Sequence, residues 1–259
     1  MPAQDHSSSK ATLHRPSRSW GQRLLPADWH EKLQVGRYPI KQFIRQQFLP
    51  RLKSGDRVLD AGSGKLDEQT MRAELLATGA HLETLDFIPG EGIDHVADVA
   101  DTKLPAQSYD ALLCVQVLEH VPDPARVCHE LFRLCKPGGW VVVTAPQSGR
   151  LHNLPHHYFH FTNIAMRKLL TDAGFEVLAL EPQGGHFLLL AEMGHLTCRV
   201  LDRAATTLLR RLMLFPFQVW ARFWHGLVKR AFYCWLDRRL FFPNNTQGWN
   251  ALCRRPQAS

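Results

Sequence analysis

A short glycine-rich turn near residue 60 has residue types that suit a nucleotide-like ligand. Asp60 ends the apolar run Val58-Leu59-Asp60, and Gly62 and Gly64 follow with one residue between them. Glycine lets the backbone approach a ligand without an intervening Cβ atom, and a helix that begins after the turn offers unpaired N–H groups. The stretch therefore predicts a cradle for a cofactor.

Three classes of ligand compete for this turn. A P-loop requires G-x-x-x-x-G-K-[ST], but Gly64-Lys65 is followed by Leu66 and position 59 is leucine. A dinucleotide site requires G-x-G-x-x-G, but position 67 is aspartate rather than a third glycine. The remaining interpretation is an S-adenosylmethionine site, in which acidic residues at successive strand ends share the ligand. The turn by itself weakens the first two interpretations and does not select the third.

Strands and helices must alternate along the chain to position this turn. Apolar runs predict strands over 57–60, 80–87, 94–99, 109–116, 140–144 and 175–180, and helices over 38–52, 66–78, 123–136 and 162–173. We expect Pro137-Gly138-Gly139 to close the helix over 123–136. A last strand over 246–254 is expected to pair antiparallel with the sixth. The pattern predicts a doubly wound, Rossmann-like α/β fold with a seven-stranded, mostly parallel sheet, whose ligands bind at the carboxyl ends of the strands.

The chain is expected to form one main domain with additions. Residues 1–20 are Ser-rich and basic without the apolar core of a secretory signal, and they predict a disordered tail. We assign 21–185 to the main domain, 186–242 to an amphipathic helical insert, and 243–259 to the last strand and a C-terminal tail. No run in the insert approaches the ~20 apolar residues of a membrane-spanning helix.

Charge is distributed unevenly along the chain. Residues 1–58 carry 11 basic and 4 acidic side chains, residues 59–194 carry 9 and 18, and residues 195–259 carry 11 and 2. An acidic centre thus lies between two basic flanks, which suit phosphates of nucleic acid, anionic lipid headgroups or an acidic substrate, or form ordinary solvated surface. The six cysteines form no C-x-x-C pair, which favours buried thiols and a cytoplasmic location.

Four stretches in order resemble the class I S-adenosylmethionine-dependent methyltransferases of the small-molecule type. They are VLDAGSG (58–64), ETLDF (83–87), LPAQSYDALLCVQVLEHVPDP (104–124) and ELFRLCKPGGWVVVTAP (130–146). The resemblance covers roughly residues 36–181, about half of the chain. It implies S-adenosylmethionine as the cofactor and methyl transfer as the activity.

The resemblance also implies which residues bind the cofactor. Asp60, Gly62 and Gly64 would line its methionine and ribose part, and Asp86 would accept both ribose hydroxyls. The alternative role of the two carboxylates is helix capping. The family often has a further glycine at the position of Leu66.

Four more cofactor contacts follow from the same resemblance. Asp98 would accept from the adenine amino group, and Val99 would supply backbone groups beside it. Gln116 would lie where the fourth strand passes the sulfonium. Arg37 resembles an arginine that reaches the methionine carboxylate in some relatives, although a surface role is an equally good interpretation.

A loop rich in histidine is the predicted place of the methyl acceptor. Methyl transfer to an activated sulfonium mainly requires that two reactants be positioned and water excluded, and a base is needed only if the acceptor loses a proton. Relatives show Pro, His and aromatic-Thr here, matched by Pro155, His157, Phe161 and Thr162. His157 is therefore the first acceptor-side candidate, followed by His160 and His120; the alternative is a structural hydrogen bond.

A metal site is the less favoured interpretation of the same loop. His152, His156, His157 and His160 lie close in sequence, but they have no recognised ligand spacing and no carboxylate partner nearby. We therefore predict no metal.

The insert carries an aromatic face and a basic face. The apolar side chains are Trp220, Phe223, Trp224, Leu227, Val228, Ala231, Trp235 and Leu236, with Arg222, His225, Lys229 and Arg230 mostly on the other side. This pattern is typical of a helix in a membrane interface, and residues 210–240 are expected to meet an anionic membrane surface. Packing against the main domain or a homodimer partner would produce the same stripe.

Together these features favour a cytoplasmic, soluble or peripherally membrane-associated methyltransferase that uses S-adenosylmethionine on a small-molecule acceptor, lipid-linked or sugar-bearing. An RNA methyltransferase is the alternative enzyme, although no RNA-binding module and no N-P-P-Y tetrad is present after the fourth strand. DNA is not an expected partner. A non-catalytic scaffold anchored through the insert is the alternative outside the enzymes.

Overall fold

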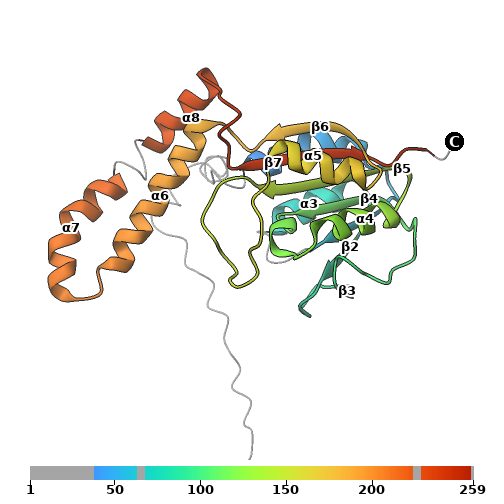
Figure 1. The fold of residues 1–259 in the computed structure, drawn as a ribbon, viewed down its shortest axis with the longest axis horizontal. Helices are drawn as coiled ribbons and strands as arrows, with labels where there is room; N and C mark the ends of the chain where they lie inside the picture. Colours follow the sequence, from blue (N-terminus) through green and yellow to red (C-terminus); the bar gives the residue numbers. More distant parts are fainter. Residues whose placement is uncertain (1–37, 63–67, 224–228, 258–259) are drawn as a thin grey trace, which may run out of the picture. The chain divides into compact units, whose positions relative to one another are not determined.

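The computed structural model describes residues 38–62, 68–223 and 229–257. These residues form a seven-stranded sheet in the order β3-β2-β1-β4-β5-β7-β6 (Figure 1). Its strands are β1 (Arg57–Ala61), β2 (His81–Asp86), β3 (His95–Val96), β4 (Tyr109–Val115), β5 (Cys135–Pro146), β6 (Glu176–Pro182) and β7 (Gly248–Arg254). All neighbouring pairs are parallel except those that include β7. The predicted doubly wound sheet with an antiparallel last strand is confirmed.

Helices lie on both faces of the sheet. In chain order they are α2 (Tyr38–Phe43), η2 (Ile44–Phe48), η3 (Leu49–Arg51), α3 (Glu68–Ala77), η4 (Leu118–His120), α4 (Pro124–Leu134), α5 (Asn163–Asp172), α6 (His186–Ala204), α7 (Leu208–Phe223) and α8 (Lys229–Arg239). The predicted helix over 38–52 is thus divided into an α-helical, a π-helical and a 3₁₀ segment.

Two apolar cores follow from the alternation of side chains along β4. Ala111, Leu113 and Val115 pack with α2, η2 and α3, whereas Leu112 and Cys114 pack with α4 and α5. Successive residues of a strand point to opposite faces, so a continuous apolar run is expected for a strand covered on both sides. Burial raises the pKa of the Cys128 and Cys135 thiols to about 12, so both remain protonated.

The Pro137-Gly138-Gly139 segment does not close a helix, so that prediction is wrong. α4 ends at Leu134, Cys135 is already extended, and β5 begins there. Gly138 donates to the carbonyl of Arg255, and Arg255 donates to that of Gly139. A Cβ atom at Gly139 would lie 2.7 Å from the Asp110 carbonyl oxygen. The glycines are therefore required by close pairing within the sheet rather than by a helix end.

Among the described residues between β6 and β7 are the helices α6, α7 and α8, and α6 contacts both of the others. The buried Asp237 of α8 accepts from the backbone nitrogens of Gly185 at 2.9 Å, Phe187 at 3.1 Å and Leu188 at 3.2 Å. These donors include groups at the start of α6 that have no partner within the helix. The end of α8 therefore holds the start of α6 in place.

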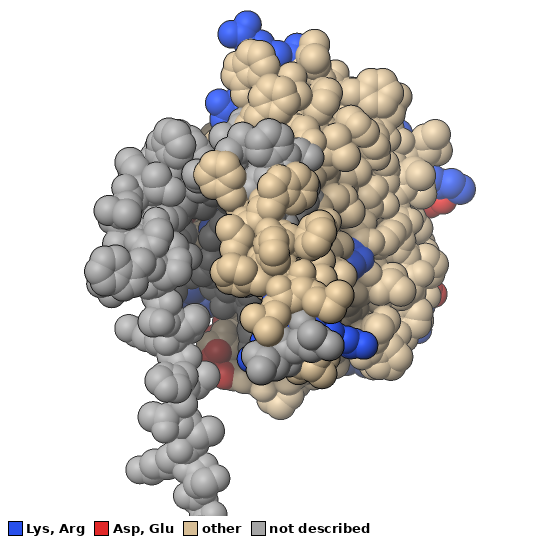
Figure 2. Space-filling view, turned by 90° about the vertical axis from the view of Figure 1, so that its left-hand side faces the viewer, with Lys and Arg blue, Asp and Glu red and all other residues tan. Residues whose placement is uncertain are grey.

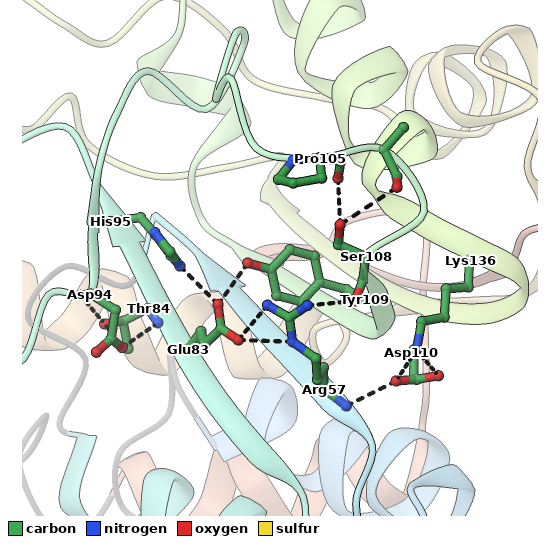
Figure 3. Close-up of polar contacts among 11 residues, drawn as sticks. Arg57, Glu83, Thr84, Asp94, His95, Pro105, Ser108, Tyr109, Asp110 and Lys136 are labelled. Carbon is green, nitrogen blue, oxygen red and sulfur yellow. Dashed lines mark hydrogen bonds and ion pairs between the residues drawn. The ribbon is translucent and has the colours of Figure 1, made fainter.

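A second polar network ties four strands together near the amino ends of β1 and β4. Glu83 of β2 accepts from Arg57 at 2.7 Å and from the Tyr109 hydroxyl at 2.8 Å, and it lies 2.8 Å from the His95 ring (Figure 3). Burial alone would raise the pKa of Glu83, but the hydrogen bonds from His95, Arg57 and Tyr109 lower it to about 2. The carboxylate is therefore charged at neutral pH and joins β1, β2, β3 and β4.

Within the described residues, no helix combines the length and the apolar composition that crossing a bilayer requires.

Candidate functional site

The polar residues predicted at strand ends meet at the carboxyl edge of the sheet. Asp60 in β1 is level with Thr84 in β2, and Asp86 is the last residue of β2. Gln116 directly follows β4, and its backbone nitrogen donates to Thr144 of β5. Adjacent parallel strands end together, so the structure brings Asp60, Asp86 and Gln116 to one edge. Gly64 and Arg37 lie outside the described residues.

Gly62 turns the chain immediately after β1. Its φ of +79° is one that residues with a side chain rarely adopt, and its nitrogen donates to the Leu85 carbonyl at 2.7 Å. A Cβ atom here would collide with the side chain of Val117. The glycine is thus needed for the turn itself and for its close approach to the segment after β4.

Asp86 and Asp98 each fold back on their own loop. The half-buried Asp86 accepts from the backbone nitrogen of Ile88 at 2.9 Å, and the exposed Asp98 accepts from that of Ala100 at 2.8 Å. Val99, which directly follows Asp98 in the predicted adenine loop, is buried in the core. The structure therefore fixes both carboxylates at the ends of β2 and β3 through local backbone bonds.

Glu130 on α4 anchors the loop that carries Asp98. Its Oε1 atom accepts from the backbone nitrogen and the hydroxyl of Thr102, and Arg133 donates to the Leu104 carbonyl at 2.7 Å. The bond from Arg133, together with those from Thr102, lowers the pKa of Glu130 to about 2 against the effect of its burial. A permanent carboxylate thus holds this loop to the helix.

Gln116 has an unusual backbone for a residue with a side chain. Its φ is +56°, a left-handed conformation that costs roughly 1–2 kcal/mol outside glycine. The side-chain amide donates to Thr144 Oγ1 at 3.2 Å, and the backbone nitrogen lies 3.1 Å from the same oxygen. A strained backbone conformation persists only where the surrounding structure enforces it, and such conformations are common at functional sites.

Three histidines from two segments form a cluster next to this edge. His120 of η4, with His152 and His157 of the loop between β5 and α5, place ring nitrogens within 4.8 Å of one another. The ring of the exposed His160 lies 5.0 Å from that of His157. Burial lowers the pKa of His120 and of His157, so both imidazoles are neutral at pH 7.

One ring-to-carbonyl contact and one backbone hydrogen bond hold η4 against the histidine loop. His120 Nδ1 lies 2.6 Å from the carbonyl oxygen of His156, and the Tyr158 nitrogen donates to the Glu119 carbonyl at 2.8 Å. The predicted acceptor-side residues His120, His157 and His160 are thus brought together. His156 lies outside the cluster, with its ring 3.2 Å from the Tyr158 hydroxyl.

Glu119 is a buried acid that the sequence analysis did not single out. Its side chain is fully buried, and neither carboxylate oxygen has a hydrogen-bond partner among the described residues. Burial raises the pKa of this carboxyl to about 7, and its Oε1 atom lies 3.8 Å from His120 Nε2. In the sequence, only its position directly before His120 could have identified Glu119 as a site residue.

The chemistry of the donors at the sheet edge fits S-adenosylmethionine. Asp86 and Asp98 offer carboxylate acceptors for hydroxyl and amino groups at the ends of adjacent strands. Asp60 is buried beside the positive-φ turn at Gly62. Hydroxyls, an amino group and a cationic centre are the groups that such carboxylate acceptors accommodate.

Comparison with known proteins points to the same ligand. Residues 30–180 match the family described as a methyltransferase domain. A ubiquinone biosynthesis O-methyltransferase of Bordetella pertussis is 37% identical over 100 residues, which are 34% of this chain and 42% of the relative. One from Hydrogenovibrio crunogenus is 27% identical over 61% of this chain and 66% of its own length. The match thus spans about two fifths to two thirds of these curated relatives.

Solved structures share the fold at low sequence identity. The [4+2]-cyclase SpnF has a TM-score of 0.55 and 16% identity, over 85% of this chain and 80% of the cyclase. A SAM-dependent methyltransferase from Archaeoglobus fulgidus has a TM-score of 0.51 and 16% identity, over 87% of this chain and 97% of its own. The family match covers more than half of the chain and agrees with the sheet order and the residues at its carboxyl edge. This chain belongs to the class I S-adenosylmethionine-dependent methyltransferases.

Proposed function

We propose that this chain transfers the methyl group of S-adenosylmethionine to an oxygen atom of a small, lipophilic acceptor. The observation that carries the proposal is the convergence of Asp60, Gly62, Asp86 and Gln116 at one sheet edge. The histidine cluster next to this edge, on η4 and the loop after β5, gives a second set of polar groups for the acceptor.

The residues at the sheet edge would hold the cofactor. Asp86 would accept from the ribose hydroxyls, Asp98 and Val99 would bind the adenine, and Asp60, Gly62 and Gln116 would line the remainder. When bound, S-adenosylmethionine supplies a methyl group that already carries an activated leaving group. The protein then has to orient the acceptor and exclude water. The buried Val99 and Val117 beside these residues favour exclusion of water.

The histidine cluster is the proposed acceptor side of the site. Neutral imidazoles offer lone pairs toward a hydroxyl group, which must lose its proton when its oxygen is methylated. His120 and His157 are part of the cluster, and His160 lies beside it. The curated relatives are named O-methyltransferases, which supports oxygen as the methylated atom.

An apolar surface on α7 supports a lipophilic acceptor that is reached from a membrane. Figure 2 shows the left-hand side of Figure 1, where most of the described surface is formed by residues without charge, with Lys and Arg scattered at its edges and within it. Among the side chains of α7 that the structure describes, the large apolar ones with exposed fractions of 49 to 66% are Leu212, Met213, Phe215, Phe217, Val219, Trp220 and Phe223. Monomeric proteins rarely expose so many large apolar side chains on one helix.

The positive charge of residues 195–259 indicates which kind of surface α7 would contact. Residues 195–259 carry 11 basic and 2 acidic side chains, and Arg210 and Arg211 are exposed next to the apolar residues of α7. A basic, apolar helix has the complementary properties of an anionic lipid surface. Ubiquinone, which the names of the relatives mention, is a lipid. We therefore favour a membrane-borne acceptor over a sugar-bearing one.

The stripe predicted over residues 220–236 is distributed over two helices. Trp220 and Phe223 belong to α7, whereas Trp235 and Leu236 belong to α8. Residues 224–228 lie outside the described residues. The proposed membrane contact therefore rests on α7.

Isothermal titration with S-adenosylmethionine and with its demethylated product tests the cofactor site. Wild type is expected to bind both ligands, and Asp86→Ala is expected to weaken binding at least about tenfold, because a charge-assisted bidentate contact is lost. Asp172→Ala, which removes an exposed carboxylate of α5, is the matched control. Absence of binding to wild type, or equal binding to Asp86→Ala, would contradict the proposal.

Incubation of a cell extract with methyl-labelled cofactor tests the acceptor. Label is expected in the lipid or small-molecule pool after fractionation. Label in the RNA pool would instead support the alternative of an RNA methyltransferase. Cofactor binding without transfer to any pool would support the non-catalytic scaffold.

A further inference from the structure

Two histidines that are far apart in sequence face each other through the same ring atom. His120 Nε2 lies 3.1 Å from His152 Nε2, and the two rings are nearly perpendicular, with an interplanar angle of 88°. Two ring nitrogens at this distance attract each other only if a proton or a cation lies between them. Which of these applies depends on where each ring carries its own proton.

Backbone carbonyls determine the tautomers of both rings. His120 Nδ1 lies 2.6 Å from the carbonyl oxygen of His156, and His152 Nδ1 lies 3.3 Å from that of Arg150. A carbonyl oxygen only accepts, so each Nδ1 atom must carry a proton and donate it. In the neutral rings, both Nε2 atoms therefore present lone pairs to each other.

This arrangement is characteristic of histidines that bind a metal ion. A ligating imidazole usually donates its second N–H to a carbonyl or a carboxylate, which fixes the orientation of the ring. Two nitrogens that each lie about 2.0–2.1 Å from a tetrahedral zinc ion are separated by roughly 3.3–3.4 Å. The observed separation of 3.1 Å is close to that value without an ion.

Two further groups are oriented toward the same place. A ring nitrogen of His157 lies within 4.8 Å of those of His120 and His152. Its Nδ1 atom accepts from the backbone nitrogen of His152 at 3.4 Å, and its Nε2 atom is buried without a hydrogen-bond partner among the described residues. Metal ligation by His157 would replace the bond from His152. The fully buried carboxylate of Glu119, also without a partner among them, has Oε1 at 3.8 Å from His120 Nε2. A buried carboxylate without a partner is costly unless a cation compensates it.

We propose that His120, His152 and His157 form a binding site for a divalent transition-metal ion, with Zn²⁺ as the best chemical match, and that Glu119 balances its charge. Three neutral nitrogen donors suit Zn²⁺ rather than Mg²⁺ or Ca²⁺, which prefer oxygen ligands. The expectation from the sequence that no metal binds is replaced here because His120, remote in sequence, completes the set. His156 and His160, which the sequence also suggested, are not members.

A three-histidine site leaves one coordination position open. Three protein ligands and one exchangeable position are typical of zinc ions that take part in reactions. If the proposed methyl transfer is correct, an acceptor oxygen would occupy that position and lose its proton more readily. This role rests on the proposed function and would replace proton acceptance by His120 and His157, whose lone pairs the metal would hold; the metal site itself does not rest on the proposed function.

Equilibrium dialysis of tag-free, metal-depleted protein against ZnCl₂ tests the site. One tightly bound ion per chain is expected. His120→Ala and His152→Ala each remove a ligand and are expected to weaken Zn²⁺ binding at least about 100-fold. Glu119→Gln changes a group that does not ligate the ion and is expected to weaken binding about tenfold, which is typical of such outer groups. The matched controls are His156→Ala in the same loop and His129→Ala on the exposed side of α4, and both should bind as wild type does.

Cobalt substitution of the wild-type protein gives a measurement that does not depend on folding of the variants. Co²⁺ is expected to produce the intense visible bands of a four-coordinate nitrogen site. Failure of wild type to bind Zn²⁺ stoichiometrically, or equal binding by His120→Ala and His152→Ala, would overturn the proposal and leave a proton shared by two imidazoles. Titration of metal-free protein with S-adenosylmethionine separates this failure from failure of the proposed methyl transfer.

Discussion

Glu130 of α4 accepts two hydrogen bonds from Thr102, one from its backbone nitrogen at 3.0 Å and one from its hydroxyl at 2.5 Å. The same loop carries Asp98 and Val99, the residues proposed to bind adenine. A side chain on α4 therefore helps to fix the loop that carries the two residues of the proposed adenine contact.

Glu130→Gln is expected to weaken binding of S-adenosylmethionine by about three- to tenfold, or roughly 0.7–1.4 kcal/mol, since the loop loses a charge-assisted anchor. Isothermal titration measures the change. Because the pKa of Glu130 is lowered to about 2, the ratio of the two affinities should be constant from pH 5 to pH 8.

Arg126→Ala is the control for a side-chain change on the same helix, because Arg126 is exposed and only its backbone nitrogen is bonded to Asp123. Thr102→Val removes the partner hydroxyl and should reproduce part of the loss. Unaltered cofactor binding in both Glu130→Gln and Thr102→Val would show that the loop is held in place without this contact.

Gly62→Ala is expected to lower the free energy of unfolding by about 2–4 kcal/mol and to abolish cofactor binding. The substitution combines a strained positive φ with a collision between the new Cβ atom and Val117. Urea denaturation and titration with S-adenosylmethionine measure the two effects.

Gly55→Ala separates strain from collision. Gly55 has a φ of +87°, and a Cβ atom there would meet nothing within 4 Å. The free energy of unfolding of Gly55→Ala should fall by only about 1 kcal/mol, which is the cost of the backbone conformation alone. The double substitution Gly62→Ala and Val117→Ala should recover part of the stability. If Gly62→Ala and Gly55→Ala lose the same amount, the contact with Val117 is unimportant.

The parts of the site that sequence could predict are those determined locally. Asp60 and Asp86 end apolar runs, and parallel strands bring such ends together whatever the details of packing. The left-handed turn at Gly62 follows from its residue type, but its contact with Val117 requires the tertiary fold.

The histidine cluster could not be predicted in the same way. His120 and His152 are separated by 32 residues. They meet because the Tyr158 nitrogen donates to the Glu119 carbonyl and the His120 ring contacts the His156 carbonyl, which joins η4 to the loop after β5. The burial of Glu119 likewise depends on packing by several elements. Glycines in Pro137-Gly138-Gly139 looked like a helix end, since close strand pairing and helix termination select the same residue.

Glu83→Gln is expected to reduce stability at neutral pH but not in acid. The folded pKa of Glu83 is about 2, below the value of 4.5 for a free glutamate, so its charge stabilises the fold above about pH 4.5. That contribution is lost as the pH falls from 4.5 toward 2. Because the network is partly solvated, we expect about 1–2 kcal/mol rather than the full value of the pKa shift.

Urea denaturation at pH 7 and at pH 3 measures this linkage. The difference between wild type and Glu83→Gln should shrink at the lower pH. Glu176→Gln, which removes an exposed carboxylate of β6, is the matched control. A difference that is equal at both pH values would mean that the bonds from Arg57, His95 and Tyr109 do not favour the charged form.

Vesicle flotation tests the proposed membrane contact of α7. Wild type is expected to float with vesicles that contain phosphatidylglycerol and to float less with pure phosphatidylcholine or at high salt, because the attraction to lipid headgroups is screened. Phe215→Ser with Phe217→Ser removes two side chains that are each 62% exposed. At roughly 1–1.5 kcal/mol for each inserted ring, partitioning should fall about 30- to 160-fold. Ile164→Ser on α5, where the side chain is 77% exposed, controls for loss of an exposed apolar residue and should not alter flotation. Wild-type protein that stays at the bottom of the gradient with both lipid mixtures would rule out the membrane contact, and an equal loss in Ile164→Ser would mean that α7 has no special role.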